Sequence, residues 1–468
     1  MAVVRLLEPR AIDPDALVKD LAEHLRHWLP TQRWYGAVGE VPDVVIPLEL
    51  EVLCEGWPTV VWCPIEVTDP SGRIERYQLV LAIHREVAHD ADPGGLIGAV
   101  PVPSGNAYVY DAMVEPEALL LLGQLIAPDL SLASARTLRG DFSNTSVIYD
   151  ERWMLKLYRR LDDGPNPDVE VTVALGRIGL DVVPVPVAVW RRHEWDLAIV
   201  RRLYPKVPDG LEVARESLRE LFTRRCQPRE THRDFRSDAE QLGAALGAIH
   251  VGLAEAFGDE PATASGLVDS LVAHLHRVAP TGIDVERIEA AYRRLGAAED
   301  LGAAIRIHGD LHLGQALHAR RNWVIIDFEG EPSRPLAERR APSSPLRDLA
   351  GMIRSFHYAA QLTLAELSSA EDPESSVDPP RNDPELDLLA EAWIERASKA
   401  FVSGYTSVDA VHRLLPQDRS SRDALLTLFE LDKAVYEVAY ELAHRPHLAG
   451  IPLGAVVRLL DPEHQERW

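Results

Sequence analysis

Two short apolar segments in the second half of the chain each carry a carboxylate at or just past their end. Residues 307–315 read IHGDLHLGQ, and residues 323–329 read WVIIDFE. Short apolar runs of this kind are typical of buried strands. The first segment delivers Asp310, and the second delivers Asp327. Gln315 adds an amide oxygen five positions after Asp310, so the pattern indicates a site built from several side-chain oxygens.

These oxygens match the needs of phosphoryl transfer from ATP. That reaction needs metal ions on the phosphates, a cation that neutralises them, and a carboxylate beside the attacking hydroxyl. Asp310 fits the catalytic role next to the hydroxyl. Gln315 and Asp327 fit the role of Mg²⁺ ligands, since Mg²⁺ prefers hard oxygen donors and commonly uses one or two carboxylates. Glu329 is placed near a second metal ion.

Lys156 is the candidate cation for the nucleotide phosphates. It lies in the strand-like run WMLKLY at 153–158, between two leucines. The alternative is a solvent-facing lysine on an edge strand that protects solubility. The pattern of the apolar neighbours instead indicates that Lys156 points inward. Glu170 follows fourteen residues later, early in a helix expected after Pro167, and is predicted to hold Lys156 in place. An acidic residue in a first helical turn is also favourable through the helix dipole alone.

A polar turn precedes the lysine strand. Residues 140–146 read GDFSNTS, and their backbone N–H groups and hydroxyls are predicted to cover the phosphates. The candidate contacts in this turn are Ser143, Asn144, Thr145 and Ser146. The sequence contains no GxxxxGK[ST] motif, which excludes the P-loop class. The segment from Val200 to Tyr204 is predicted to be the hinge, with backbone groups of Val200 and Leu203 meeting the nucleotide base.

The overall composition narrows the partners. The chain has 73 acidic and 49 basic side chains, a formal net charge of −24. Such a surface repels nucleic acids and anionic membranes, so neither is expected as a partner. Three cysteines do not form a disulfide framework. No segment reads as a membrane span or a signal peptide, so we expect a cytoplasmic enzyme.

The order of patterns predicts three parts. A helix over 13–29 and strands over 43–68 and 73–84 form a small N-terminal unit, 1–95, which ends in a Gly- and Pro-rich segment. A β-rich unit follows over 96–204. The remainder, 205–468, is mostly helical, with amphipathic helices over 236–256, 386–404 and 421–443.

A strand lysine, a helix glutamate, HGDxHxxQ and IDFEGE together resemble the protein-kinase-like phosphotransferases, which include aminoglycoside and choline kinases. Their usual motif is HGDxHxxN, whereas Gln315 replaces the asparagine here. Bacterial maltokinases share this departure, and the sequence resembles them more closely. The closer match is carried by residues 32–35, 143–147, 155–157, 164–170, 308–332, 335–342, 344–352, 430–437 and 440–441.

The resemblance implies a bilobal, eukaryotic-protein-kinase-like α+β fold with an N-terminal α/β cap subdomain, a β-rich nucleotide lobe and a helical acceptor lobe. It also implies ATP and Mg²⁺ as cofactors and transfer of the γ-phosphate to the anomeric hydroxyl of maltose. The product, maltose 1-phosphate, feeds α-glucan and glycogen synthesis. Association with trehalose synthase and a monomeric state are further expectations.

Polar residues of the helical lobe are expected to grip the sugar. The candidates are His308, Arg347, Glu430, Lys433, Tyr436 and Glu437. Glu430, Lys433 and Glu437 share one face of the 421–443 helix by their spacing, although a solvated helix face would look the same.

Two alternatives stay open. One is another small-molecule kinase of the same fold, acting on glucosamine or an aminoglycoside. The other is a non-catalytic pseudokinase scaffold, which would predict the loss of a catalytic carboxylate or lysine. Lys156, Asp310, Gln315 and Asp327 are all present.

Overall fold

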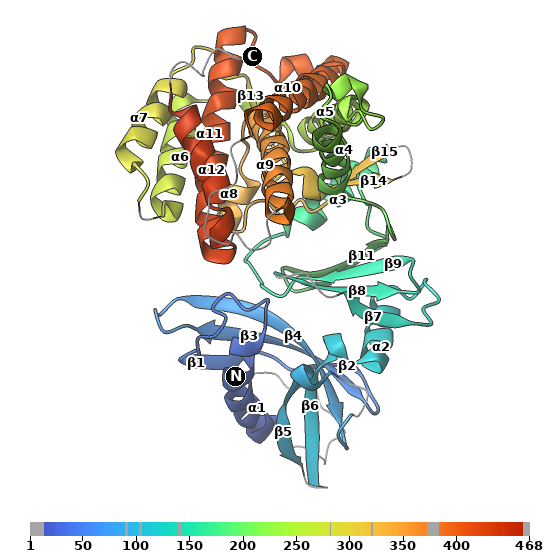
Figure 1. Ribbon diagram of the computed structural model, residues 1–468. Helices are drawn as coiled ribbons and strands as arrows, with labels where there is room; N and C mark the ends of the chain where they lie inside the picture. Colours follow the sequence, from blue (N-terminus) through green and yellow to red (C-terminus); the bar gives the residue numbers. More distant parts are fainter. Residues whose placement is uncertain are drawn as a thin grey trace. The chain divides into compact units, whose positions relative to one another are not determined.

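The structure is a computed structural model that describes residues 14–88, 92–102, 105–138, 143–280, 282–319, 322–371 and 383–461. The chain divides into two compact units. Unit 1 comprises Met1–Val169 and Val185–Pro205, and unit 2 comprises Glu170–Pro184 and Lys206–Trp468. Figure 1 labels the elements of both units.

The first half of unit 1 is an antiparallel sheet covered by one helix. The strands pair in the order β1-β3-β4-β6-β5, with β2 also on β3. Apolar side chains of the helix α1 pack with those of β3 and β4 in one buried core. The elements are α1 (Pro14–Trp28), β1 (Val44–Pro47), β2 (Glu51–Cys54), β3 (Thr59–Thr68), β4 (Ile74–His84), β5 (Leu96–Val102) and β6 (Gly105–Asp111).

This sheet extends past the predicted boundary at residue 95. Strand β6 pairs with β4, and β5 pairs with β6, so both strands belong to the N-terminal sheet. The Gly- and Pro-rich segment that suggested a boundary contains the short turn Pro93–Gly95 and much of β5. Gly and Pro there mark turns within one sheet, because such residues interrupt strands without separating domains.

The second half of unit 1 is another antiparallel sheet, in the order β10-β11-β9-β8-β7. Its elements are α2 (Pro116–Ile126), β7 (Ala135–Leu138), β8 (Thr145–Tyr149), β9 (Trp153–Leu157), β10 (Ala188–Arg192) and β11 (Trp195–Arg202). The predicted strands around residues 146–149, 153–158 and 197–200 are confirmed. The buried Gln78 of β4 donates to the carbonyl oxygens of Tyr158 and Leu197, at 2.6 and 2.8 Å. The two sheets are therefore joined directly.

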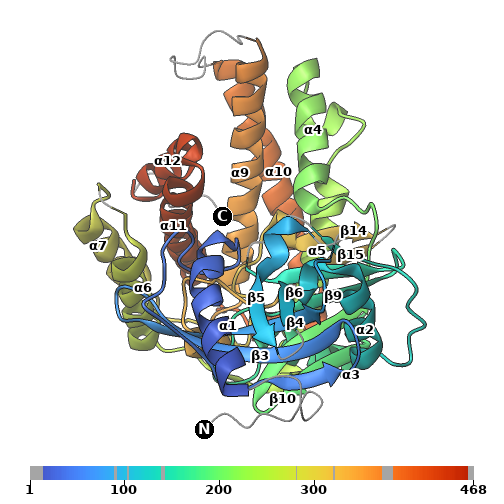
Figure 2. The same cartoon turned by 90° about the horizontal axis from the view of Figure 1, so that it is seen from below.

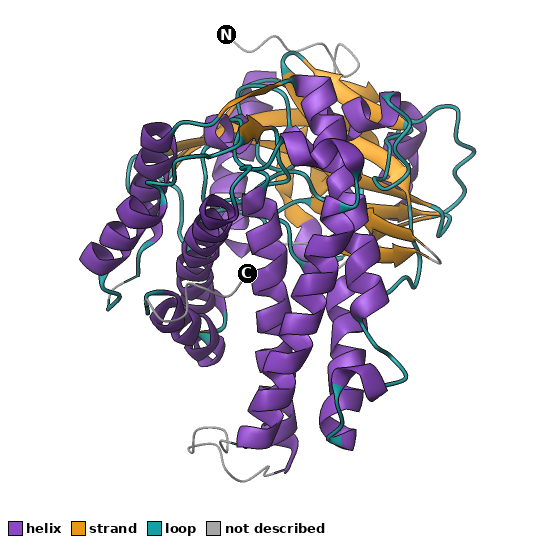
Figure 3. Ribbon diagram, turned by 90° about the horizontal axis from the view of Figure 1, so that it is seen from above, coloured by secondary structure: helices purple, strands orange, loops and turns teal. Residues whose placement is uncertain are grey.

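Unit 2 is mostly helical (Figure 3). Its helices are the greater part of α3 (Pro167–Arg177), then α4 (Gly210–Arg224), α5 (Arg236–Phe257), α6 (Ala264–Val278), α7 (Val285–Leu295), α8 (Leu336–Arg340), α9 (Leu346–Glu371), α10 (Pro384–Thr406), α11 (Arg419–His444) and α12 (Gly450–Leu459). Helices α5, α10 and α11 confirm the three amphipathic helices predicted from periodicity. In the described part of the chain, none of the helices has the length and apolar character of a membrane span.

Close helix packing shapes the core of unit 2. Gly243 of α5 and Gly404 of α10 lie where these helices meet, and a Cβ atom at Gly404 would lie 1.8 Å from the carbonyl oxygen of Glu240. Only glycine permits this approach. Figure 2 shows the long helices of unit 2 beside one another, and the buried apolar residues of α5, α9, α10 and α11 form one core.

Short strands of unit 2 lead into the acidic segments. They are β12 (Asp259–Pro261), β13 (Ala303–Ile305), β14 (Ala316–Ala319) and β15 (Asn322–Ile325). The first acidic segment follows β13, and β14 and β15 pair antiparallel after it. The HGD residues themselves are loop rather than strand, which leaves their backbone amides free to be bound by side chains.

Candidate active site

The loop that carries Asp310 is held by a buried carboxylate from the start of α9. The backbone N–H groups of His308 and Gly309 donate to the two oxygens of Asp348, at 2.7 and 2.9 Å. Gly309 has a φ of 81°, in the left-handed region that glycine adopts without strain. The Asp348 side chain is 1% exposed. Two charge-assisted hydrogen bonds to Asp348 therefore fix the backbone of the loop before Asp310.

His308 links the two acidic segments instead of contacting a sugar. Its Nε2 donates to the carbonyl oxygen of Ile326 at 2.9 Å, and its Nδ1 accepts from the N–H of Asp310 at 3.3 Å. The residue is 1% exposed, and its ring packs against Phe328. Both ring nitrogens are thus committed to the backbone. The sugar-binding role predicted for His308 does not fit this geometry.

Asp310 is paired with Lys433 of α11. The Lys433 Nζ lies 2.6 Å from Asp310 Oδ1 and 3.0 Å from Glu331 Oε1. It also lies 4.6 Å from the centre of the Tyr436 ring, in a cation–π contact. Burial by itself lowers the pKa of the Lys433 ammonium, but Asp310 and Glu331 outweigh burial and raise that pKa. Lys433 therefore stays charged beside the candidate catalytic carboxylate.

A buried ionic network supports this pair. Glu331, which is 2% exposed, accepts from Arg334 at 3.0 Å and from Arg347 at 3.1 Å. Arg334 also donates to Asp432 at 3.0 Å, and His274 lies 3.1 Å from Asp432. The arginines and Lys433 lower the pKa of Glu331 although burial raises it. Arg347, predicted to bind sugar, is thus engaged with Glu331.

Two other predicted sugar contacts of α11, Glu430 and Glu437, lie near Arg354 of α9. Glu437 accepts from Arg354 of α9 at 2.7 Å. Glu430 is 4% exposed, and its burial raises the pKa of its carboxyl to about 7 despite the nearby charge of Arg354. Lys433 contacts Asp310 whereas Glu437 contacts Arg354, so the structure separates residues that the spacing had grouped. Tyr436 and Lys433 are the members that lie at Asp310.

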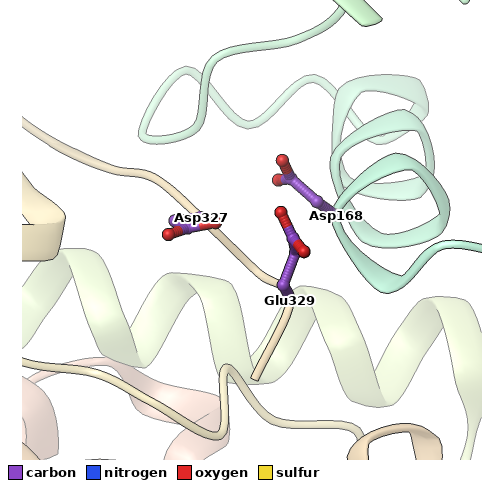
Figure 4. Close-up of side chains that lie close together, drawn as sticks. All are labelled: Asp168, Asp327 and Glu329. Carbon is purple, nitrogen blue, oxygen red and sulfur yellow. The ribbon is translucent and has the colours of Figure 1, made fainter. Parts of the chain in front are cut away.

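The predicted metal ligands form a second group of oxygens. The amide nitrogen of Gln315 donates to Asp327 Oδ2 at 3.0 Å, which leaves the Gln315 amide oxygen directed elsewhere. Asp327 and Glu329 of unit 2 each offer one carboxylate oxygen, and these two oxygens lie within 4.8 Å of each other (Figure 4). Asp168, at the start of α3, was not predicted, although it lies in the 164–170 segment of the resemblance.

The acidic partner of Lys156 is Asp168 rather than Glu170. Lys156 is 5% exposed, and its Nζ lies 3.6 Å from Asp168 Oδ2. Glu170 accepts instead from Arg306 at 2.8 Å and from Arg340 at 2.9 Å. Successive residues of an α-helix are rotated by about 100°, so two positions apart they face nearly opposite sides. The predicted Lys156–Glu170 pair is therefore replaced by Lys156–Asp168.

The polar turn is partly described. Gly140, Asp141 and Phe142 lie outside the described residues. Ser143 and Asn144 directly precede β8, and Thr145 and Ser146 are its first residues, with Ser146 opposite Lys156. The Thr145 hydroxyl accepts from Arg159 at 2.8 Å. Arg159 is in turn paired with Asp111 at 2.5 Å, and both side chains are buried. An ion pair at the end of the first sheet thus supports this turn.

The predicted hinge groups are engaged by the sheet. The carbonyl oxygen of Val200 accepts from the N–H of Val187, and the N–H of Leu203 donates to the carbonyl oxygen of Arg152, both at 2.8 Å. Val200 is 1% exposed. The Leu203 N–H is therefore already bonded to Arg152, so this N–H does not fit the predicted contact with a base.

The residues that the sequence prediction did not name share one property. They are buried charged or polar groups that contact the predicted residues directly or through one another. They are Asp168, His250, His274, Glu331, Arg334, Asp348 and Asp432. The signal that could have indicated several of them was their place within the motif-like segments 164–170, 308–332, 344–352 and 430–437.

Comparisons with known proteins agree with this architecture. Residues 28–114 match the family model of the maltokinase N-terminal cap domain, a range that includes β1 to β6. The glucosamine kinase of Streptacidiphilus jiangxiensis is 28% identical over 336 residues, which cover 67% of this chain and 70% of that protein. The glucosamine kinase of Mycolicibacterium smegmatis is 27% identical over 342 residues, covering 70% and 79%.

Solved structures show the same fold. A crystal form of glucosamine kinase aligns with a TM-score of 0.60 at 23% identity, covering 93% of this chain and 97% of that one. Its complex with glucosamine, ADP and inorganic phosphate aligns with a TM-score of 0.59 at 22% identity, covering 94% and 99%. The chain therefore carries a maltokinase-type cap domain and has the α+β fold of the protein-kinase-like superfamily.

Proposed function

We propose that this protein is a maltokinase, which transfers the γ-phosphoryl group of ATP to the anomeric hydroxyl of maltose and gives maltose 1-phosphate and ADP for α-glucan and glycogen synthesis. The match of residues 28–114 to the maltokinase cap domain is the observation that carries the choice of maltose. The proposal includes a cytoplasmic, monomeric enzyme and association with a trehalose synthase that supplies maltose.

The reaction needs few groups from the protein. The oxygen of the acceptor hydroxyl attacks the γ-phosphorus, the bond to the bridging oxygen of the β-phosphate breaks, and ADP leaves. The hydroxyl proton passes to Asp310, whose carboxylate is held by its loop and by Lys433. An anomeric hydroxyl is more acidic than an ordinary alcohol, so a carboxylate is an adequate base. Lys156 is the cation for the phosphates of ATP.

The proposed magnesium ligands are Asp327, Gln315 and Glu329. The carboxylates of Asp327 and Glu329 fit Mg²⁺, because they offer hard oxygen donors within 4.8 Å of each other. The Gln315 side chain lies against Asp327 through its amide nitrogen. When bound, Mg²⁺ would neutralise the charge on the phosphates. Ser143–Ser146 would lie over these phosphates.

Glucosamine is the second candidate acceptor. It is favoured by the two relatives at 27–28% identity, both named glucosamine kinase. A sequence identity of 27–28% supports a common fold but does not fix the sugar specificity, because one or a few pocket residues decide such preferences. The two candidates share the catalytic apparatus and differ in the acceptor pocket.

The test is ADP release with ATP and Mg²⁺ across maltose, glucose, glucosamine, trehalose and kanamycin, with the phosphate position determined by NMR. Maltose-dependent release that yields the 1-phosphate supports the proposal, and release only with glucosamine refutes the choice of maltose. Asp310→Asn should lose at least about a hundredfold in kcat. Asp387→Asn, a matched change in the exposed first turn of α10, should keep full activity. No release with any acceptor would favour a pseudokinase scaffold.

A further inference from the structure

The carboxylates around Asp310 already have cations of the protein as partners. Asp310 and Glu331 share Lys433, and Glu331 also binds Arg334 and Arg347. Asp432 is paired with Arg334. Cations of the protein therefore balance much of the negative charge at the place where an acceptor would bind at Asp310.

An amino sugar needs the opposite arrangement. Its ammonium group loses hydration when it is bound, and the loss is compensated only where a carboxylate or several acceptors face it. Next to Asp310 the first charged group is instead the Lys433 ammonium, whose side chain is 12% exposed. An ammonium on the acceptor would meet a like charge at this place.

The position of the hydroxyl makes this contact direct. An anomeric hydroxyl that hydrogen-bonds to Asp310 lies beside the carboxylate that Lys433 binds at 2.6 Å. The substituent at C2 is on the neighbouring carbon of the ring, so it comes close to Lys433 as well. A neutral C2 hydroxyl can accept a hydrogen bond from the lysine, whereas a C2 ammonium can only be repelled.

We propose that Lys433 is a specificity-determining residue that restricts the acceptor to uncharged sugars and rejects 2-amino sugars. This inference rests on the proposed function, because it assumes that the anomeric hydroxyl binds at Asp310.

The expected discrimination follows from the repulsion. The two like charges are the Lys433 ammonium and the C2 ammonium of the sugar. At a separation of a few ångströms and an effective dielectric constant of about 20, their repulsion should weaken binding by roughly a hundredfold. Removal of the lysine charge should reduce this factor below about tenfold. Lys433→Arg keeps the positive charge and should therefore retain most of the discrimination against glucosamine.

The test compares inhibition constants of glucose, 2-deoxyglucose and glucosamine against maltose. Glucosamine should bind roughly a hundredfold more weakly than 2-deoxyglucose in the wild type, where the two sugars differ in the C2 ammonium. Lys433→Met should narrow that ratio, and Lys399→Met, which removes an exposed lysine, should leave it unchanged. Equal binding of the two sugars by the wild type, or the same ratio in Lys433→Met, would overturn the inference.

The two proposals fail in different ways. If the wild type does not phosphorylate maltose, the proposed function fails, and calorimetric binding of the same three sugars still tests Lys433. If Lys433→Met is inactive, calorimetry gives its ratio of affinities directly. If it does not fold, the inference is decided by the wild type and Lys433→Arg, both of which must reject glucosamine relative to 2-deoxyglucose.

Discussion

Replacement of Asp348 by Asn should loosen the loop that carries Asp310. The two oxygens of Asp348 accept from the backbone N–H groups of His308 and Gly309 and from His250 Nε2, at 2.7, 2.9 and 3.0 Å. Asparagine has the same size, but one oxygen becomes an NH₂ donor and the charge is lost. At least one of these buried donors then has no acceptor.

The magnitude follows from the burial of the group. A hydrogen bond to a charged partner contributes about 1.5–3 kcal/mol, and an unsatisfied buried donor costs about 1–3 kcal/mol. We expect Asp348→Asn to lower the free energy of unfolding by about 3 kcal/mol. A displacement of Asp310, the proposed catalytic carboxylate, by about 1 Å costs on the order of a hundredfold in rate, so kcat should fall more than the affinity for ATP.

The assay combines urea unfolding, steady-state kinetics and hydrogen exchange at the His308 and Gly309 amides. Exchange at these two amides should accelerate in Asp348→Asn and remain slow in Asp387→Asn, the exposed control. Since His250 and the amides hold the pKa of Asp348 below its ordinary value although burial raises it, this contribution to stability is present above the unfolded pKa and lost as the pH falls. A destabilisation below about 0.5 kcal/mol with unchanged exchange would refute the reasoning.

Three further predictions concern other buried charges. Lys156→Met leaves Asp168 without its lysine and should reduce kcat/KM for ATP by about a hundredfold or more, measured against Lys399→Met; wild-type values would contradict the phosphate role. Arg159→Met should lower the free energy of unfolding by about 3–5 kcal/mol, because the buried Asp111 loses its partner; a thermal transition unchanged from the wild type would refute this. Glu430 has a pKa raised by burial to about 7, so its ionisation destabilises the fold as the pH rises above the unfolded pKa, up to a plateau above about 7. Glu430→Gln should therefore stabilise the protein by up to about 3 kcal/mol at pH 8 and have little effect at pH 5 in urea unfolding; equal effects at both values would exclude this explanation.

Local patterns in the sequence were sufficient for much of the fold. Helical periodicity located α5, α10 and α11, because the apolar face of a surface helix repeats along the chain itself. A local run of apolar residues likewise located the strand that carries Lys156. The boundary near residue 95 was wrong, because a Gly- and Pro-rich segment looks alike whether it joins two strands or two domains. Only the pairing of β5 and β6 with the earlier strands decides between them.

The sequence by itself determined which side chains we propose for the chemistry. Asp310, Gln315 and Asp327 stand in short segments whose residue types and spacing are set by adjacent positions. The tertiary structure decided what each of them faces. Lys433 reaches Asp310 across 123 positions of the chain, and His308 binds backbone rather than sugar. The α3 helix turns Asp168, and not Glu170, toward Lys156. A periodic pattern gives the phase of one element, whereas the partner of a buried charge depends on how several elements pack, and that information is absent from any single segment.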